Sequence, residues 1–182
     1  MAVREAIAEF TGAWRWVKPS PMSMPFRNDA ADRVVHLARA YLQADYRWEH
    51  DGDWHDVRIG LPAPGLEMAH PGATSFGFLS AWNPHSVELP EEENRANDQA
   101  LHDALVASGL PFRAAFASAP NRSWREPSWV TMGMPVEEFD ALAARFGQLG
   151  TLWWTAGSSV RMRLQAQRPD GFEGDAYIDW LK

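Results

Sequence analysis

Two asparagines near the start of a predicted helix are the residues of this sequence best placed to bind a ligand. Asn94 and Asn97 precede Leu101 at helical spacing, so they lie on the stripe expected to face the rest of the protein. An apolar residue is usual there, because a buried amide without a partner costs about 1–3 kcal/mol. Two amides in this stripe therefore favour either a polar pocket or a set of internal hydrogen bonds.

The turn before this helix supplies further polar groups. Asn83, His85 and Ser86 follow an apolar run, and the first turn of a helix leaves backbone N–H groups without intrahelical partners. Together these groups would form a cradle for a carboxylate, a phosphate or a polar ring. The alternative is that the two asparagines only tie the turn down, and the three glutamates at 91–93 would oppose an anion unless they point outward.

The elements that must position these groups follow from periodicity and turn residues. A helix is expected to begin at Asn28 or Asp29 and to bury a stripe that ends at Tyr41. Asp51-Gly52 predicts a tight hairpin within residues 45–60. Residues 61–72 contain three prolines and are expected to form a loop or a short turn. The remaining predicted strands are 74–82, 112–118, 128–134, 151–155 and 159–165, and the remaining helices are 90–108 and 135–147.

The order of these elements, α-β-β-β-α-β-β-α-β-β, predicts the α+β class, with about three helices packed on a mainly antiparallel sheet. Residues 1–27 are expected to form an N-terminal appendage with a short helix over 3–10, because Lys18-Pro19-Ser20-Pro21 prevents its continuation. Residues 28–165 are expected to form one domain, and residues 166–182 a tail that packs on it.

Composition excludes several classes of function. The 182 residues contain no Cys, so disulfides, Cys-ligated zinc, iron–sulfur clusters and thiol catalysis are excluded. A net charge of −7 disfavours nucleic acid as a partner. The sequence lacks a secretory signal and a run of about 20 apolar residues, so a cytoplasmic protein without a membrane partner is expected.

Other chemical motifs are weak. His50 and His55 flank the predicted hairpin turn, but no third ligand stands at motif spacing, so no metal is expected and the pair is interpreted as a solvated hairpin tip. The nucleophile elbow, the glycine-rich dinucleotide loop and the phosphate-binding P-loop are absent, so no cofactor is expected. Arg145, Arg161 and Arg163 suit either a rim that binds anions or ordinary pairing with the surplus of acidic residues.

Four short motifs carry a resemblance to a known family. They are FGFLSAWNPHS, ENRAN, WREPSW and LAARFGQ, followed by a strand that contains Trp. In this order, over about residues 41–154, the chain resembles a bacterial family catalogued as domain-of-unknown-function family 3293. The resemblance supports the fold and implies functional positions at Asn83, Pro84, Ser86, Asn94, Glu126, Ser128 and Gln148.

The chain departs from the family pattern at several polar positions. Leu149 replaces the Asn of the family's F-G-Q-N run, Asp98 stands at the final Asn of E-N-x-x-R-N, and Thr155 and Ala156 replace the Gly-Glu that often follows Trp154. If those positions serve chemistry, this member is altered or inactive. The family carries no assigned activity, so the resemblance implies no particular reaction.

The sequence thus predicts a protein that binds a small polar or anionic ligand, nucleotides included, at residues 83–97. Asn83, Asn94 and Asn97 would orient the ligand, Ser86 would contact its negative part, and His85 or Glu126 would move a proton without a metal. The further ligand-binding candidates are Trp82 and Trp124 as walls, with Ser128 and Gln148. Whether the protein is an enzyme stays open.

The alternative is a non-catalytic module that binds a protein partner. It rests on the acidic surface of residues 88–103 and on the Trp-rich ends of the chain.

Overall fold

The computed structural model describes residues 29–174 and 176–182. The expected N-terminal appendage and its helix lie outside this range. The described helices are α2 (Asp29–Gln43), α3 (Pro64–Ala69), α4 (Glu91–Ser108) and α5 (Val136–Arg145), with a 3-10 turn at Pro84–Ser86. The described strands are β1 (Asp45–His50), β2 (Asp53–Val57), β3 (Ser75–Leu79), β4 (Phe112–Ser118), β5 (Arg125–Met132), β6 (Gly150–Thr155), β7 (Arg161–Leu164) and β8 (Ile178–Trp180).

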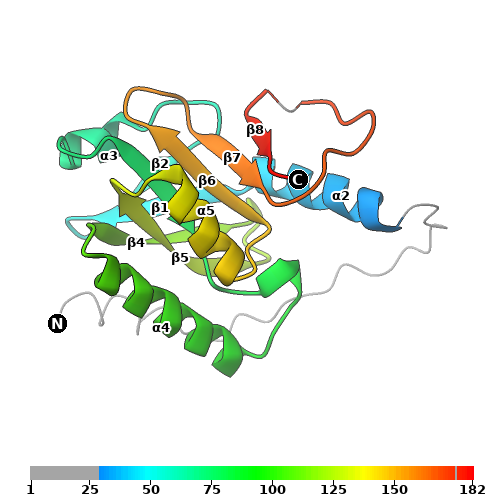
Figure 1. The fold of residues 1–182 in the computed structure, drawn as a ribbon, viewed down its shortest axis with the longest axis horizontal. Helices are drawn as coiled ribbons and strands as arrows, with labels where there is room; N and C mark the ends of the chain where they lie inside the picture. Colours follow the sequence, from blue (N-terminus) through cyan, green and yellow to red (C-terminus); the bar gives the residue numbers. More distant parts are fainter. Residues whose placement is uncertain (1–28, 175) are drawn as a thin grey trace.

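All eight described strands belong to one sheet, in the order β2-β1-β4-β5-β3-β6-β7-β8 (Figure 1). Each neighbouring pair is antiparallel except β7 and β8, which are parallel. The α+β class and the mainly antiparallel sheet are therefore confirmed. β3 lies inside the sheet and all five of its residues are buried, which is why its sequence shows a continuous apolar run instead of an alternating one.

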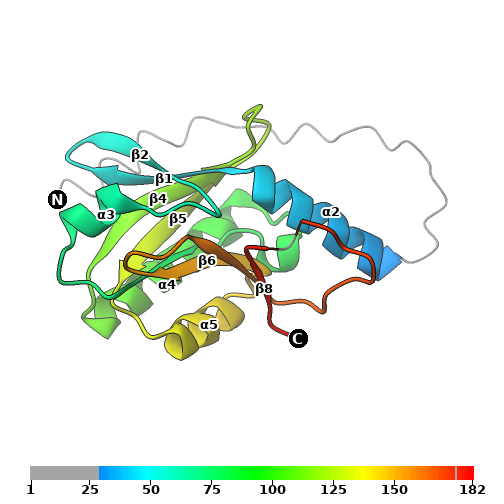
Figure 2. The ribbon, with the colours of Figure 1, turned by 90° about the horizontal axis from the view of Figure 1, so that it is seen from above.

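Helices cover both faces of the sheet. Figure 2 shows α4 and α5 on one side and α2 on the other. The core under α4 and α5 includes Leu101, Leu105 and Phe139, together with Trp129 of β5. The larger core lies on the opposite face and contains Trp48, Trp154 and many smaller residues. None of the described helices is both long and apolar enough to cross a membrane.

The sheet curls round the larger core. After β2 the chain forms a parallel bridge between Ile59 and Val160, just before β7. Two hydrogen bonds reinforce it: Gly60 N donates to Val160 O at 2.9 Å, and Val160 N donates to Leu61 O at 2.9 Å. Segments that flank opposite parts of the sheet are thus joined, and the apolar face between them is enclosed.

Local signals located most element ends correctly. Asp51 and Gly52 both have positive φ, 53° and 87°, as a type I′ hairpin turn requires. Pro90 immediately precedes α4, and Gly109 ends it in the left-handed conformation at φ 69°. Gly147, which was expected to end the following helix, also has positive φ.

Three segments differ from the prediction. Residues 64–69 form the short helix α3 instead of a loop, because Pro64 occupies a first helical position, where its missing N–H is harmless. β5 begins at Arg125, three residues before the predicted start at Ser128, and ends at Met132. β3 pairs only with residues 129–132 of β5, so Pro127 lies where β5 has β4 alone as a neighbour and its lack of a donor is tolerated.

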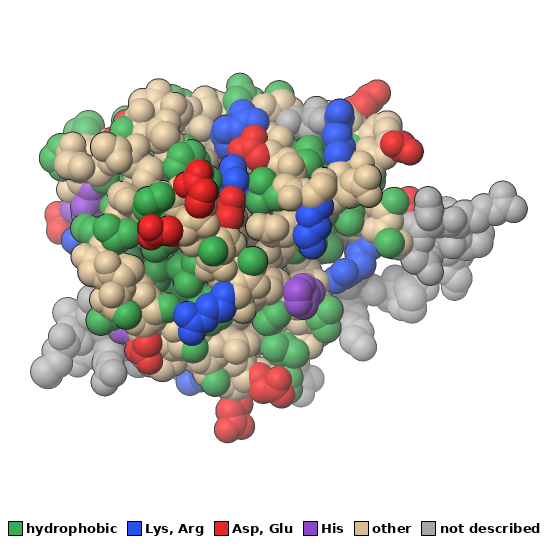
Figure 3. Space-filling view, in the orientation of Figure 1, with side chains coloured by type: hydrophobic (Ala, Val, Ile, Leu, Met, Phe, Trp, Pro, Cys, Tyr) green, Lys and Arg blue, Asp and Glu red, His purple; other side chains and the backbone are tan. Residues whose placement is uncertain are grey.

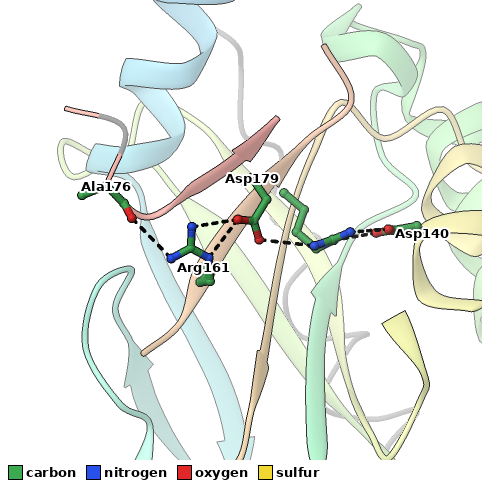
Figure 4. Close-up of polar contacts among 5 residues, drawn as sticks. Asp140, Arg161, Ala176 and Asp179 are labelled. Carbon is green, nitrogen blue, oxygen red and sulfur yellow. Dashed lines mark hydrogen bonds and ion pairs between the residues drawn. The ribbon is translucent and has the colours of Figure 1, made fainter. Parts of the chain in front are cut away.

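The third difference is β8, which the sequence did not predict. A ladder of charged side chains fixes it to β7 and α5 (Figure 4). Arg163 pairs with Asp140 of α5 and with Asp179 of β8, and Arg161 donates to Asp179 and to the carbonyl oxygen of Ala176. Arg161 and Arg163 therefore follow the pairing alternative and are engaged by acidic residues of this chain.

Close packing makes one glycine of β3 sensitive to substitution. A Cβ atom built on Gly77 would lie 2.3 Å from Phe139 Cε2 of α5. Gly77→Ala is expected to lower the free energy of unfolding by about 1–3 kcal/mol, because overpacking displaces a fully buried ring. Urea denaturation measures this change. Gly65→Ala in α3 is the matched control, since nothing lies within 4 Å of its Cβ position; an equal loss in both variants would refute the packing explanation.

Candidate functional site

The turn that follows β3 has an unusual backbone conformation. Asn83, His85 and Ser86 have φ values of 49°, 57° and 56°, in the left-handed region that non-glycine residues occupy at a cost. Asn tolerates this region better than most residues. Three such residues within four positions need external support, and backbone strain that is supported in this way is common at functional sites.

Two further helices supply part of that support. The guanidinium of Arg33 in α2 donates to His85 O at 2.6 Å and to Ser86 O at 3.4 Å. The hydroxyl groups of Tyr41 in α2 and Ser86 share a short hydrogen bond. At the end of α5, Gly147 O accepts a bond from His85 N at 2.7 Å. Contacts from other elements thus add to the turn's own backbone hydrogen bonds, Ser86 N to Asn83 O at 2.8 Å and Val87 N to Pro84 O at 3.2 Å.

Asn94 completes the support from α4. Its side chain accepts from Asn83 N at 2.7 Å and donates to Asn83 Oδ1 at 2.9 Å and to Leu89 O at 3.2 Å. The residue is only 2 % exposed, and these bonds use both of its amide hydrogens and its oxygen. Asn94 therefore holds the turn in place through internal hydrogen bonds, which was the alternative to ligand binding that the sequence left open.

Glu126 of β5 lies beneath the same turn. Asn83 Nδ2 donates to Glu126 Oε1 at 2.7 Å. Burial raises the pKa of Glu126 to about 7, and the bond from Asn83 only partly offsets this effect. The carboxyl group is therefore able to gain or lose a proton near neutral pH, as a residue that moves a proton must.

A cleft of about 290 Å³ opens beside this network, between the turn, α4 and the end of α5. Its lining residues are Pro84, His85, Asn97, Ala144, Arg145, Phe146 and Gly147. Gly147 helps to keep it open: its φ is 62°, and a Cβ atom there would lie 3.0 Å from Pro84 Cβ and 3.1 Å from His85 Nε2. Figure 3 shows this face of the molecule, where basic and His side chains are exposed beside apolar ones.

Three polar side chains of the cleft retain their hydrogen-bonding capacity. Within residues 29–174 and 176–182, the His85 ring, the Asn97 amide and the Arg145 guanidinium form no hydrogen bond or ion pair with another side chain or with the backbone. The guanidinium carbon of Arg145 lies 5.2 Å from the centre of the Phe146 ring. Glu91, Glu92 and Glu93 are all exposed, and Arg95 pairs with Glu91 at 2.6 Å, so part of the acidic charge is compensated.

The two asparagines thus have different surroundings. Asn97 lines the cleft, whereas Asn94 is saturated by protein groups. Ser86 is engaged by Tyr41. Of His85 and Glu126, only His85 is among the described lining residues of the cleft.

Two of the remaining residues that the sequence predicted for the site donate hydrogen bonds to backbone carbonyl groups near the turn. Gln148 Nε2 donates to Trp82 O at 3.1 Å, and Ser128 Oγ donates to Glu126 O at 3.2 Å. The indole nitrogen of Trp82 is buried without a hydrogen-bond partner. Trp124 packs against the larger core and is not among the described residues that line the cleft.

The structure also places the His50 and His55 pair and Asp98, which the sequence singled out. The His50 and His55 rings lie 6.1 Å apart beside Trp48, and the described residues contain no group of three or more His, Asp or Glu that could hold a metal ion. Asp98, at a position where the family has Asn, accepts a bond from Trp129 Nε1 at 3.0 Å and so joins α4 to β5. Burial raises the pKa of Asp98.

The sequence left two alternatives for Arg145, an anion-binding rim or pairing with acidic residues, and did not connect it with Asn97. Gly147 was the residue in the sequence that could have indicated this connection, because it follows α5 and contacts the turn. That contact between residues 84–85 and 147 depends on tertiary packing.

Comparison with known proteins gives one match. The model of a family described as protein of unknown function DUF3293 matches residues 79–150. No curated protein and no solved structure matches the chain. The matched segment runs from the last residue of β3 to the first residue of β6 and contains Asn83, Asn94, Glu126 and every described lining residue of the cleft. The resemblance stated from the sequence motifs is therefore confirmed for residues 79–150, which match the model of this family of proteins of unknown function.

Proposed function

We propose that the protein binds a small organic anion, of the size of a mononucleotide or smaller, in the cleft formed by the turn after β3, α4 and the end of α5. The supporting observation is that His85, Asn97 and Arg145 line one cleft and form no polar contact with other described residues. Arginine and the side-chain amide are suited to carboxylate and phosphate oxygens, and arginine forms forked hydrogen bonds with both.

The size of the cleft limits the ligand. A volume of about 290 Å³ is at the lower end of small-molecule pockets. The aromatic ring of Phe146 and the apolar surface of Pro84 and Ala144 offer contact to a ring or a short aliphatic chain. The rigid turn keeps His85 in place before a ligand arrives, which reduces the entropy lost on binding.

Isothermal titration of the full-length protein with adenosine 5′-monophosphate tests the proposal. Arg145→Gln is expected to weaken binding about tenfold, because it removes a charge-assisted hydrogen bond. Asn97→Ala is expected to weaken it by a smaller factor. Adenosine, which lacks the phosphate, should bind far more weakly than the nucleotide.

The matched control is Arg39→Gln, which removes an exposed arginine of α2. It lies outside the described lining of the cleft, and its affinity should equal that of the wild type. Equal affinities for wild type and Arg145→Gln, or an equal loss in Arg39→Gln, would refute the proposed site.

A further inference from the structure

A second hollow, of about 210 Å³, lies on the sheet itself. Strand register brings its residues together: Asp45 of β1 pairs with Ser118 of β4, Ser118 pairs with Arg125 of β5, and Arg47 pairs with Phe116. Cross-strand partners and residues two apart share a face, so these five side chains point the same way. All of them line the hollow.

This face is the one that α4 and α5 cover elsewhere. Ala114, two residues before Phe116, packs in the core beneath these helices. The ends of β1, β4 and β5 at residues 45, 118 and 125 extend beyond that core, and no described helix residue lines the hollow there.

Positive charge converges on the hollow. Among the described residues that line it are Arg47, Arg122 and Arg125, together with one carboxylate, that of Asp45. Arg47 Nε lies 3.0 Å from Asp56 Oδ1 but without hydrogen-bond geometry, and Asp56 also pairs with Arg58 at 3.1 Å. In a chain with a net charge of −7, three guanidinium groups around one depression are a local reversal of charge.

The surroundings of Arg125 show that these charges interact. Its guanidinium carbon stacks on Phe116, 3.5 Å from the ring centre, and lies 5.7 Å from the centre of the Trp54 ring. Burial lowers the pKa of Arg125 to about 10, and the positive charges of Arg122 and Arg47 contribute to this effect. An anion in the hollow would relieve that repulsion.

The hydroxyl group of Ser118 adds a donor. Ser118 is 5 % exposed, and its side chain forms no hydrogen bond with the described residues. Its hydroxyl oxygen is not fully buried, so it is accessible from the hollow that the residue lines.

We propose that this hollow binds a phosphate group through Arg47, Arg122, Arg125 and the hydroxyl of Ser118. Two considerations favour a phosphate over a larger ligand or a lone carboxylate. A volume of about 210 Å³ is below the usual range of small-molecule pockets. Three cations around the hollow favour a dianion, and guanidinium forks match the oxygens of phosphate.

Phosphorus NMR of inorganic phosphate, titrated with the full-length protein at low salt, tests this site. Arg122→Gln is the first variant, because Arg122 lies in an exposed loop and its replacement leaves the strands intact. It is expected to weaken phosphate binding about tenfold, and Arg125→Gln is expected to do the same. Added salt should weaken binding by the wild type.

Two controls separate this site from others. Arg113→Gln removes an exposed arginine of β4 from the opposite face of the same sheet and should bind phosphate as the wild type does. Arg145→Gln removes the arginine of the cleft beside α5, so it should abolish only the phosphate binding that belongs to the cleft and leave binding in the hollow unchanged. Absence of binding to the wild type, or unchanged binding by both Arg122→Gln and Arg125→Gln, would overturn the proposal. A loss of phosphate binding only in Arg145→Gln would overturn it and favour the cleft instead.

The same variants identify the source of the phosphate group. Phenyl phosphate and a short single-stranded oligonucleotide are titrated in parallel. Arg122→Gln should weaken every probe that uses the hollow, and a probe that this variant leaves unaffected is excluded as a ligand of the site.

Discussion

Asn94→Ala is expected to lower the free energy of unfolding by about 3 kcal/mol. The substitution removes three hydrogen bonds and leaves the buried N–H of Asn83 without its acceptor. Each of the three bonds contributes about 1 kcal/mol to stability. Urea denaturation measures the loss. The sequence-based hypothesis, in which Asn94 is a ligand-binding residue, predicts instead that the fold stays intact.

Asn97→Ala is the matched control for this substitution. It removes the same side chain from the same helix, three residues later, where the amide contacts the cleft and forms no bond with other described residues. Its effect on unfolding should stay below about 0.5 kcal/mol. If both variants lose the same stability, the difference assigned here to the two amides is wrong.

Glu126→Gln is expected to make the protein more stable than the wild type at pH 8. Because the folded state raises the pKa of Glu126 from 4.5 to about 7, the folded state binds the proton more tightly than the unfolded chain. The contribution of Glu126 to the free energy of unfolding of the wild type is therefore largest below about pH 4.5. It falls as the pH rises through about 7 and changes no further above that value. Each pKa unit corresponds to about 1.4 kcal/mol, so the full effect is about 3 kcal/mol at most.

The glutamine variant keeps the acceptor for Asn83 Nδ2 and carries no charge, so this part of the pH dependence should disappear. Thermal or urea unfolding between pH 5 and pH 8 compares the two proteins. Glu88→Gln, at an exposed position, is the control and should retain the wild-type profile. A Glu126→Gln profile parallel to that of the wild type would show that Glu126 is ionised normally in the folded protein.

Short-range signals predicted most of the fold. Several element ends depend on the backbone preferences of single residues, so they can be predicted without tertiary information. Examples are the Asp51-Gly52 turn, Pro90 before α4 and Gly109 after it. The apolar run around Gly77 predicted a central strand for the same reason. The sequence could not predict β8. Its three residues form a strand only because they pair with β7 and because Asp179 contacts two arginines.

The sequence predicted some of the contacts around the candidate site, whereas its role in binding stays a prediction. Helical spacing correctly placed Asn94 toward the sheet, and the turn at residues 83–86 was correctly identified as its neighbour. Spacing could not separate Asn94 from Asn97, since the two differ only by the rotation of three residues around α4. Contact of that turn with Gly147 and Arg145 required the packing of α5. Prediction of the hollow at Arg125 would have required the register of three strands, because its basic residues do not form a run in the sequence.

The most direct test of the proposed cleft is a ¹H–¹⁵N NMR titration of the full-length protein with adenosine 5′-monophosphate, observing the side-chain amides of asparagine. If the nucleotide binds in this cleft, the Asn97 amide signals should shift progressively with its concentration, while those of Asn94, whose amide is bonded to Asn83 and Leu89, should move much less. Shifts confined to Asn94, or no shift of the Asn97 signals at saturating nucleotide, would contradict it.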